Sequence, residues 1–532
     1  MKRISILIIA GAAVLATSCN KYLDINTNPN QAVSTTPELI IPQALTGTAS
    51  LLNQFNTYGL QIGGYGSNAG GYGGFGTAFT YNFTSADYNG LWSSGYDNLE
   101  DYQTVINQTN SQQPAYSYAN GVARIMRVIG FEQLVNAYNS VPYTNALQGD
   151  SSLTPTYTDP LIIYKDLADQ LDIAIAAINK GIASPGVAKE LGSTDVLFKG
   201  DMVKWKQLAN TVKLRLLLYG AGKVTFTNST ITSDGFLTTD ALINPGYARD
   251  NSRQNPKWDR YGFSSTGSDV TKSWIPSTFI MSFYNGIKLQ DSGRGKAIYY
   301  LYAYTYGATP PAANTPTLGT GQLGVENVNN VKCPSGSFWY PGTNRAGTSA
   351  GNATGTLKGP NAAYPLLTAA ESYFLQAEGA LKGLVTGTSA ATSFSNGIAA
   401  SYKYLYLLPD GTTSGNPTTD AAKYMTDNAG NRLVDYSAAT TDAQRLEAII
   451  TQKYIAMNMV NSEVGWNDYR RTHYPTISGT SATSTFASTV SESTRADKLP
   501  VRLMYPAVEG ALNSVNVPKS LSPFTSLVFW AL

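Results

Sequence analysis

The sequence predicts a mainly α-helical protein with long irregular loops. Apolar residues recur at three-and-four spacing in several segments, which is the pattern of a helix with one buried face. Capping residues stand at the ends of several of these segments. Between residues 226 and 361 the periodicity weakens, while Pro, Gly, Asn, Thr and aromatic residues accumulate. Helices are therefore expected on both sides of one loop-rich region.

The first half of the chain carries four predicted helices. Apolar residues at helical spacing cover the segments 88–106 and 122–129. The clearest helix covers 159–181, where a capping Asp, a proline in the first turn, a basic last turn and a closing Gly all agree. A fourth helix is predicted over 201–220, again with Asp at its start and Gly at its end.

Helices return after the loop-rich region. Thr368 and Glu371 have the spacing of a capping box, and the helix that they open is expected to close at Gly383. The remaining pattern consists of helical segments at 394–405 and 446–457 and polar separating stretches at about 409–440 and 475–498.

The N-terminus has the order of a secretory signal. Two basic residues precede an apolar run from Ile4 to Leu15, and small residues follow. Spanning a bilayer takes about 20 apolar residues, so this shorter run is expected to be removed as a signal peptide over residues 1–18. A cysteine directly after the small residues is typical of a bacterial lipobox, which predicts that Cys19 is acylated, for example with palmitate, and anchors the mature chain. The alternative is an ordinary secreted protein.

Charge and cysteine content narrow the class of protein. Without the two basic residues of the signal, the net charge falls from +2 to zero, and no long charge run offers a footprint for nucleic acid or for an anionic membrane surface. Charged residues make up 14% of the chain, against about 25% in an average protein. With 35 tyrosines, such a composition suits neutral polar ligands, although it suits any extracytoplasmic protein equally. The two cysteines provide no disulfide framework.

Catalytic and metal-binding chemistry has little support. The chain has one histidine, His473, and one cysteine besides Cys19, Cys333, so His/Cys metal sites and Ser-His-Asp relays cannot be assembled. We interpret His473 as a structural hydrogen bonder. A glycosidase needs only two carboxylates, but pairs such as Asp166 and Asp169 are typical of a solvated helix face. No enzymatic activity, cofactor or metal is therefore expected.

The chain resembles the SusD/RagB family of nutrient-binding outer-membrane lipoproteins. The resemblance is distributed over almost all of the chain, and the order and spacing of its segments are specific. The segments that carry it are Cys19–Asp24, Asn28-Pro29, Val141–Ala146, Tyr164–Leu167, Lys204-Trp205, Ala209–Arg215, Glu371–Glu378, Gly397-Ile398, Glu463–Arg471 and Arg502–Pro506.

The resemblance implies an array of tetratricopeptide-like helix pairs with an irregular insertion. We expect a single SusD-like domain over 19–532, with a helical scaffold over about 37–221 and 366–472 and a loop-rich ligand-binding insertion over about 222–365. The implied role is that of a cell-surface lipoprotein of the outer membrane, which binds glycan nutrients and delivers them to a SusC-like TonB-dependent transporter. The Trp466–Arg471 segment is expected to be structural.

Loop aromatics are the candidate ligand contacts. A sugar ring can lie flat on an aromatic ring while amide side chains bind its hydroxyls. The same scaffold could instead bind peptide or glycopeptide, and a lipid-anchored glycan hydrolase is the third hypothesis. The candidate residues are Tyr65, Tyr72, Phe75, Trp258, Trp274 and Trp339 as platforms, with Asn68 and Asn344 as hydrogen bonders.

Overall fold

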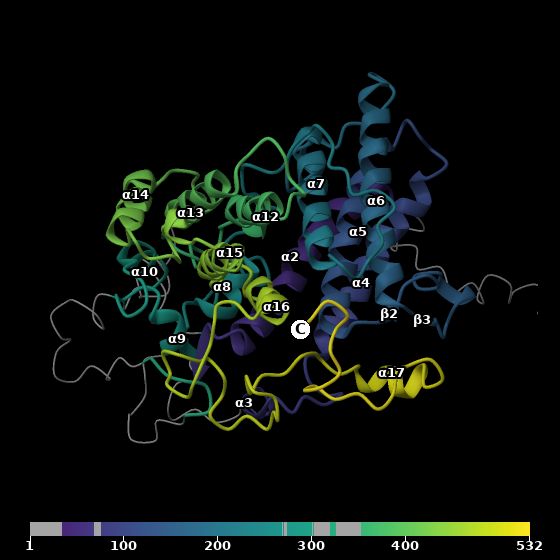
Figure 1. Ribbon diagram of the computed structural model, residues 1–532. Helices are drawn as coiled ribbons and strands as arrows, with labels where there is room; N and C mark the ends of the chain where they lie inside the picture. Colours follow the sequence, from purple (N-terminus) through teal and green to yellow (C-terminus); the bar gives the residue numbers. More distant parts are fainter. Residues whose placement is uncertain are drawn as a thin grey trace, which may run out of the picture.

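The computed structural model describes residues 35–68, 76–268, 270, 274–299, 302, 320–325 and 353–532. In this part of the chain the protein is mainly helical, with three small two-stranded antiparallel sheets (Figure 1). None of the helices described is both long enough and apolar enough to cross a bilayer. The predicted fold class is confirmed.

The first part of the scaffold is a stack of five long helices. Each packs on the next along the chain, α2 on α4, α4 on α5, α5 on α6 and α6 on α7. Figure 1 shows α4, α5, α6 and α7 side by side. Their bounds are α2 Pro37–Ile62, α4 Asn89–Thr109, α5 Ser117–Tyr138, α6 Pro160–Ile182 and α7 Met202–Tyr219.

The second part of the scaffold continues this array and closes it. Helix α12 packs on α7, on α13 and on α15, while α13 packs on α14 and α15 on α16. Helix α16 returns to α2, so the two parts share one hydrophobic core. The bounds are α12 Ala369–Leu381, α13 Ala390–Tyr406, α14 Pro417–Asp427, α15 Asp442–Met457 and α16 Ser462–Thr472.

Shorter elements lie within, between and after these two parts. The described section of the insertion contains α8 Pro256–Tyr261, α9 Thr278–Met281 and α10 Ser292–Ile298. The sheets pair β1 Gly66–Asn68 with β5 Trp274–Pro276, β2 Val141–Pro142 with β3 Tyr157–Thr158, and β4 Ala241–Ile243 with β6 Tyr364–Leu367. The other short helices of the described residues are α3 Thr77–Thr80, α17 Ala507–Leu512 and the 3₁₀ turns Gly149–Ser151, Gly192–Thr194 and Tyr436–Ala438.

The predicted helix starts are confirmed at three caps. The side chain of Asp159 accepts from the backbone N–H of Leu161, and the side chain of Asp201 accepts from that of Lys204. Thr368 likewise caps α12. Each such cap satisfies a backbone donor that the helix itself leaves unpaired.

The second half of the predicted capping box needs a correction. Glu371 does not direct its side chain at the start of α12. Its Oε1 instead binds Nη1 of Arg215 at 2.8 Å, and Nη2 of the same arginine lies 2.5 Å from Glu132. Tertiary ion pairing in the core therefore takes precedence over the local cap.

Helix α14 is a second correction, because it lies within the stretch 409–440 that composition indicates as a polar separator. Asn416 caps it and Pro417 occupies its first turn. Only Ala421 and Tyr424 are buried in it. Two buried residues give too weak an apolar pattern for recognition from sequence.

The Trp466–Arg471 segment is structural, as predicted, because all of it is buried in α16. Arg471 binds Glu378 of α12 and Asp468 of α16, and Lys453 of α15 lies 2.9 Å from the second oxygen of Asp468. Three helices are thereby joined by buried charges.

The C-terminal segment lies across the end of the first helices (Figure 1). The backbone N–H of Leu503 donates to the carbonyl of Ala137 at the end of α5. Trp530 donates its indole N–H to Asn136, and the N–H of Leu532 donates to the carbonyl of Arg470. The last residues of the chain thus cover the junction of α5 and α16.

Candidate functional site

Three of the predicted aromatic platforms belong to the core. Tyr65 is 1% exposed, stacks on Tyr454 at a centroid distance of 4.3 Å and donates its hydroxyl to the carbonyl of that residue. Trp258 is 2% exposed and packs against Phe263. Trp274, in β5, is 8% exposed. We expected these rings to be open platforms for a sugar. The structure corrects this, because all three rings are buried and none has an open face.

The other candidates divide between one buried amide and residues outside the described part of the chain. Asn68 is buried in β1, where it pairs with Trp274 of β5. Its burial excludes a direct contact with a ligand in this structure. The candidates Tyr72, Phe75, Trp339, Asn344 and the predicted lipidation site Cys19 lie outside the described residues.

Asn68 instead anchors the segment 320–325. Its side-chain N–H₂ donates to the carbonyl of Val325, and its side-chain oxygen accepts from the N–H of Gly324, both at 3.2 Å. Gln322 of the same segment donates to the carbonyl of Ala487 at 2.8 Å. This segment is therefore held between β1 and a loop near residue 487.

A cavity of about 860 Å³ opens beside this segment and the loop that follows α16. We call it the hydroxyl-lined cleft. Its volume lies within the ~300–1,000 Å³ range of ligand pockets. Its hydroxyl lining is formed by Thr472, Thr476, Ser478, Thr480, Thr485, Ser488, Thr489 and Ser491. Its other polar lining includes Gln322, His473, Tyr474, Arg495, Asp497 and Lys498.

The end of α16 places two rings at this cleft. His473 adopts the left-handed conformation, with φ at +57°, and its N–H donates to the carbonyl of Tyr469. The chain leaves the helix at this residue. His473 is exposed as a result and Tyr474 is half-buried, whereas Tyr469 is buried behind them. His473 therefore lies on the wall of a cleft, and its interpretation as a structural hydrogen bonder stays a prediction.

Among the described residues, two positive side chains and one negative side chain line this cleft. Arg495 and Asp497 form a bidentate pair, with both N–O distances at 3.2 Å. The ammonium of Lys498 donates to the carbonyl of Ser493. Among the described residues that line the cleft, Asp497 is the one carboxylate. This described lining can bind hydroxyl and amide groups but holds no pair of carboxylates for acid-base hydrolysis.

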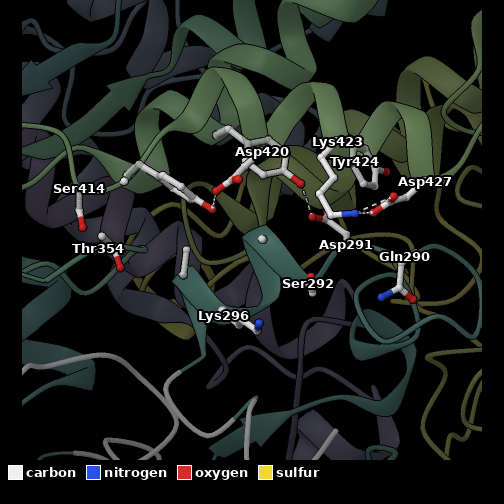
Figure 2. Close-up of a pocket in the computed structure, with 15 residues that line it drawn as sticks. Gln290, Asp291, Ser292, Lys296, Thr354, Ser414, Asp420, Lys423, Tyr424 and Asp427 are labelled. Carbon is white, nitrogen blue, oxygen red and sulfur yellow. Dashed lines mark hydrogen bonds and ion pairs between the residues drawn. The ribbon is translucent and has the colours of Figure 1, made fainter. Parts of the chain in front are cut away.

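A smaller cavity of about 380 Å³ lies between α10 of the insertion and α13 and α14 of the scaffold. We call it the insertion–scaffold cleft, and Figure 2 shows its lining. Elsewhere in the described chain, as at both clefts, no group of three or more His, Cys, Asp and Glu side chains is arranged to hold a metal ion.

Sequence reasoning missed the hydroxyl-lined cleft because most of its residues fall in the stretch 475–498, which composition indicates as a separator. A run of Ser, Thr and Gly has the same composition in a plain linker and in the lining of a polar cleft. The ordered turns along this run, such as Thr489 N–H to the carbonyl of Leu323, arise from tertiary contacts. The one feature of the sequence that could have indicated this cleft is that the run directly follows His473 and Tyr474.

Known proteins share the family and the fold of this chain. A SusD-like family model, described as "Starch-binding associating with outer membrane", matches residues 29–234 and 336–506. No curated protein is significantly similar to the chain in sequence.

Solved structures with this fold include three SusD homologs. The protein from Bacteroides uniformis is 20% identical, with 93% of this chain and 99% of that chain covered and a TM-score of 0.64. A chitin-binding SusD homolog from Flavobacterium johnsoniae is 21% identical, with coverage of 92% and 98% and a TM-score of 0.62. A SusD homolog from Bacteroides fragilis is 18% identical, with coverage of 93% and 99% and a TM-score of 0.61. These likenesses show the fold, and since the family model covers well over half of the sequence, the chain belongs to the SusD-like family.

Proposed function

We propose that this protein is a glycan-binding lipoprotein of the outer membrane that holds oligo- or polysaccharide in the hydroxyl-lined cleft. The observation that carries the proposal is the chemistry of that cleft: many hydroxyls, one Arg–Asp pair, and the rings of His473 and Tyr474 at one wall. Sugars present hydroxyls at their edges and C–H groups on their faces, so both kinds of contact are used. The family description and the chitin-binding relative agree with this ligand class.

The rest of the proposal concerns the place of the protein in the cell. A lipid at Cys19 would anchor it, and a SusC-like TonB-dependent transporter would receive the glycan at the cell surface. The support for these steps is the family and the lipobox pattern of the sequence. A Cys19→Ser variant is expected to lose palmitate incorporation and to leave the membrane fraction. Retention of both would refute lipidation at this cysteine.

Binding without cleavage is favoured over hydrolysis. Asp497 is the one carboxylate that the described part of the chain places at the cleft, and it is paired with Arg495. Most glycosidases use two carboxylates that flank the scissile bond. The peptide alternative is less well supported, because the lining offers little charge for peptide termini and side chains.

Calorimetric titration tests the proposal. The soluble chain starting at Asn20 is titrated with amylose, chitin oligosaccharides, other neutral glycans and peptides, and each mixture is then checked for cleavage products. Saturable binding of one glycan, with a Kd of order 1 mM to 1 μM and no products, is expected. Cleavage products would refute the non-catalytic role, and binding of peptides alone would refute the ligand class.

Two substitutions locate the site. His473→Asn removes a ring but keeps a residue that tolerates the left-handed conformation. Gln322→Ala removes an amide from the wall. Both are expected to weaken binding by roughly tenfold, the effect of about one lost hydrogen bond or ring contact. The matched control is Gln112→Ala, an exposed glutamine at the end of α4. Equal affinity in all three variants would place the glycan elsewhere.

A further inference from the structure

The insertion–scaffold cleft has two walls that come from different parts of the chain. Figure 2 shows Ser292 and Lys296 of α10 on one side and Asp420 of α14 on the other. Thr354 and Ser414 lie together at one end. Clefts lined by several different segments of a chain are common places for ligands.

Beneath these walls lies a fixed polar floor. Asp291 and Arg294 form an ion pair at 2.5 Å, and neither side chain is exposed. Tyr402 donates its hydroxyl to Asp291, and Arg294 donates to Gln452 at 3.0 Å. Gln452 in turn donates to the hydroxyl of Tyr424 at 2.8 Å. Because every member is held by a neighbour, this network fixes the positions of the polar groups at the base of the cleft.

Two charged side chains on the walls have hydrogen-bonding atoms available for a ligand. Asp420 accepts from the hydroxyl of Tyr406 at 2.8 Å, which leaves its second carboxylate oxygen available. Lys296 is exposed on the opposite wall. In the described part of the chain neither forms an ion pair within 4.0 Å, whereas Lys423 is bound to Asp427 at 2.8 Å. One strong acceptor and one strong donor therefore face the same small space.

We propose that the insertion–scaffold cleft is a second binding site, which takes one or two sugar rings. A sugar hydroxyl both donates and accepts, so it can bind Asp420 and Lys296 while neighbouring hydroxyls bind Ser292, Thr354 or Ser414. A volume of about 380 Å³ suits a short ligand, less than half the space of the hydroxyl-lined cleft. The rings of Tyr402 and Tyr424 are buried, so hydrogen bonds rather than stacking hold the ligand.

This inference rests on the proposed function for its ligand class but concerns a separate site. The hydroxyl-lined cleft would hold a chain of sugars, and the insertion–scaffold cleft would hold a chain end or a short fragment. A zwitterionic dipeptide could also meet Asp420 and Lys296 with its termini, but it has a single amide group for the hydroxyls of the walls, whereas a sugar has several hydroxyls. The balanced lining of hydroxyls and charges favours the sugar.

Ligand-observed saturation-transfer NMR on the soluble chain tests this site. The probes are glucose, N-acetylglucosamine, maltose and chitobiose, with alanyl-alanine as the peptide probe. Asp420→Asn and Lys296→Gln are each expected to weaken sugar binding roughly tenfold or more, because each removes a charged hydrogen bond. The matched controls are Asp442→Asn and Lys403→Gln, which change exposed charges outside both clefts.

The outcomes separate the two sites. Short sugars should still bind Gln322→Ala, and long glycans should still bind Asp420→Asn and Lys296→Gln. The second site is refuted if the wild-type protein binds long glycans but no short sugar, if both substitutions leave the sugar signals unchanged, or if alanyl-alanine binds in place of the sugars. Short-sugar binding without any long-glycan binding would instead refute the proposed function of the larger cleft. Lys296 is exposed, so Lys296→Gln remains a valid test even if Asp420→Asn fails to fold.

Discussion

Replacing Glu378 by Gln should destabilise the fold by about 3 kcal/mol at neutral pH. Glu378 is buried in α12, where its two oxygens bind Arg471 at 2.6 and 2.8 Å and one of them also binds Lys382 at 3.0 Å. Burial alone would raise the pKa of Glu378, but Arg471, with Lys382 and Lys453, outweighs burial and lowers it from 4.5 to about 2. At 1.36 kcal/mol per pKa unit, this difference corresponds to about 3 kcal/mol. Breaking a buried ion pair typically costs about 3–5 kcal/mol.

The pH dependence of this effect has a definite sign. A carboxylate whose pKa is lower in the folded state stabilises the fold above its unfolded pKa of 4.5 and loses that contribution as the pH falls towards 2. Urea denaturation of the wild type and of Glu378→Gln should therefore differ most at pH 7 and progressively less below pH 4.5. Glu190→Gln, an exposed control, should change stability by less than about 0.5 kcal/mol. A loss below about 1 kcal/mol at pH 7, or a loss that does not change with pH, would refute the reasoning.

Three further substitutions test other parts of the structure. Asn68→Ala removes the two hydrogen bonds that hold the segment 320–325. Calorimetry should therefore show glycan binding that is weaker by about tenfold. Unchanged affinity would show that the segment does not shape the cleft. Trp258→Ala should lower the free energy of unfolding, measured in urea, by about 3–5 kcal/mol, while the folded variant keeps its glycan affinity. A loss of glycan binding without a loss of stability would show that Trp258 contacts the ligand. The melting temperature of the wild type relative to that of Lys288→Met should rise between pH 8 and 10.5, since burial lowers the pKa of Lys288 from 10.5 to about 8; a difference that does not change with pH would contradict this.

Helices with local signals could be predicted from the sequence, and ligand-binding surfaces could not. Caps such as Asp159 and Asp201 act within one turn, so their chemistry is visible in neighbouring residues. Helix α14 lacks a wide apolar face because it packs on little more than α13, and its pattern was too weak. The order of the helix pairs came from the family resemblance, since sequence periodicity does not specify which helices touch.

The burial of the aromatic candidates could not be predicted from the sequence, for one physical reason. A tryptophan in a loop-rich segment can pack the loop onto the scaffold or present a ring to solvent, and its local sequence is the same in both cases. Trp258 and Trp274 do the former. The exposed ring of His473 depends on a left-handed residue at the end of α16, a backbone feature that a histidine in the sequence does not reveal.

The C-terminal segment that covers the junction of α5 and α16 has a consequence for the order of folding. Asn136 accepts a hydrogen bond from the indole N–H of Trp530, which lies 394 residues later in the chain. Asn56 accepts one from the backbone N–H of Ser462, 406 residues later. Such remote contacts slow folding, because the long loops must close before the contacts form. The first helices can form as soon as they are synthesised. Residues that they contact in the folded protein, such as Trp530, are among the last to be made. The predicted signal peptide would direct such a chain to export, and this delay would keep the polypeptide open until its whole length has crossed the membrane.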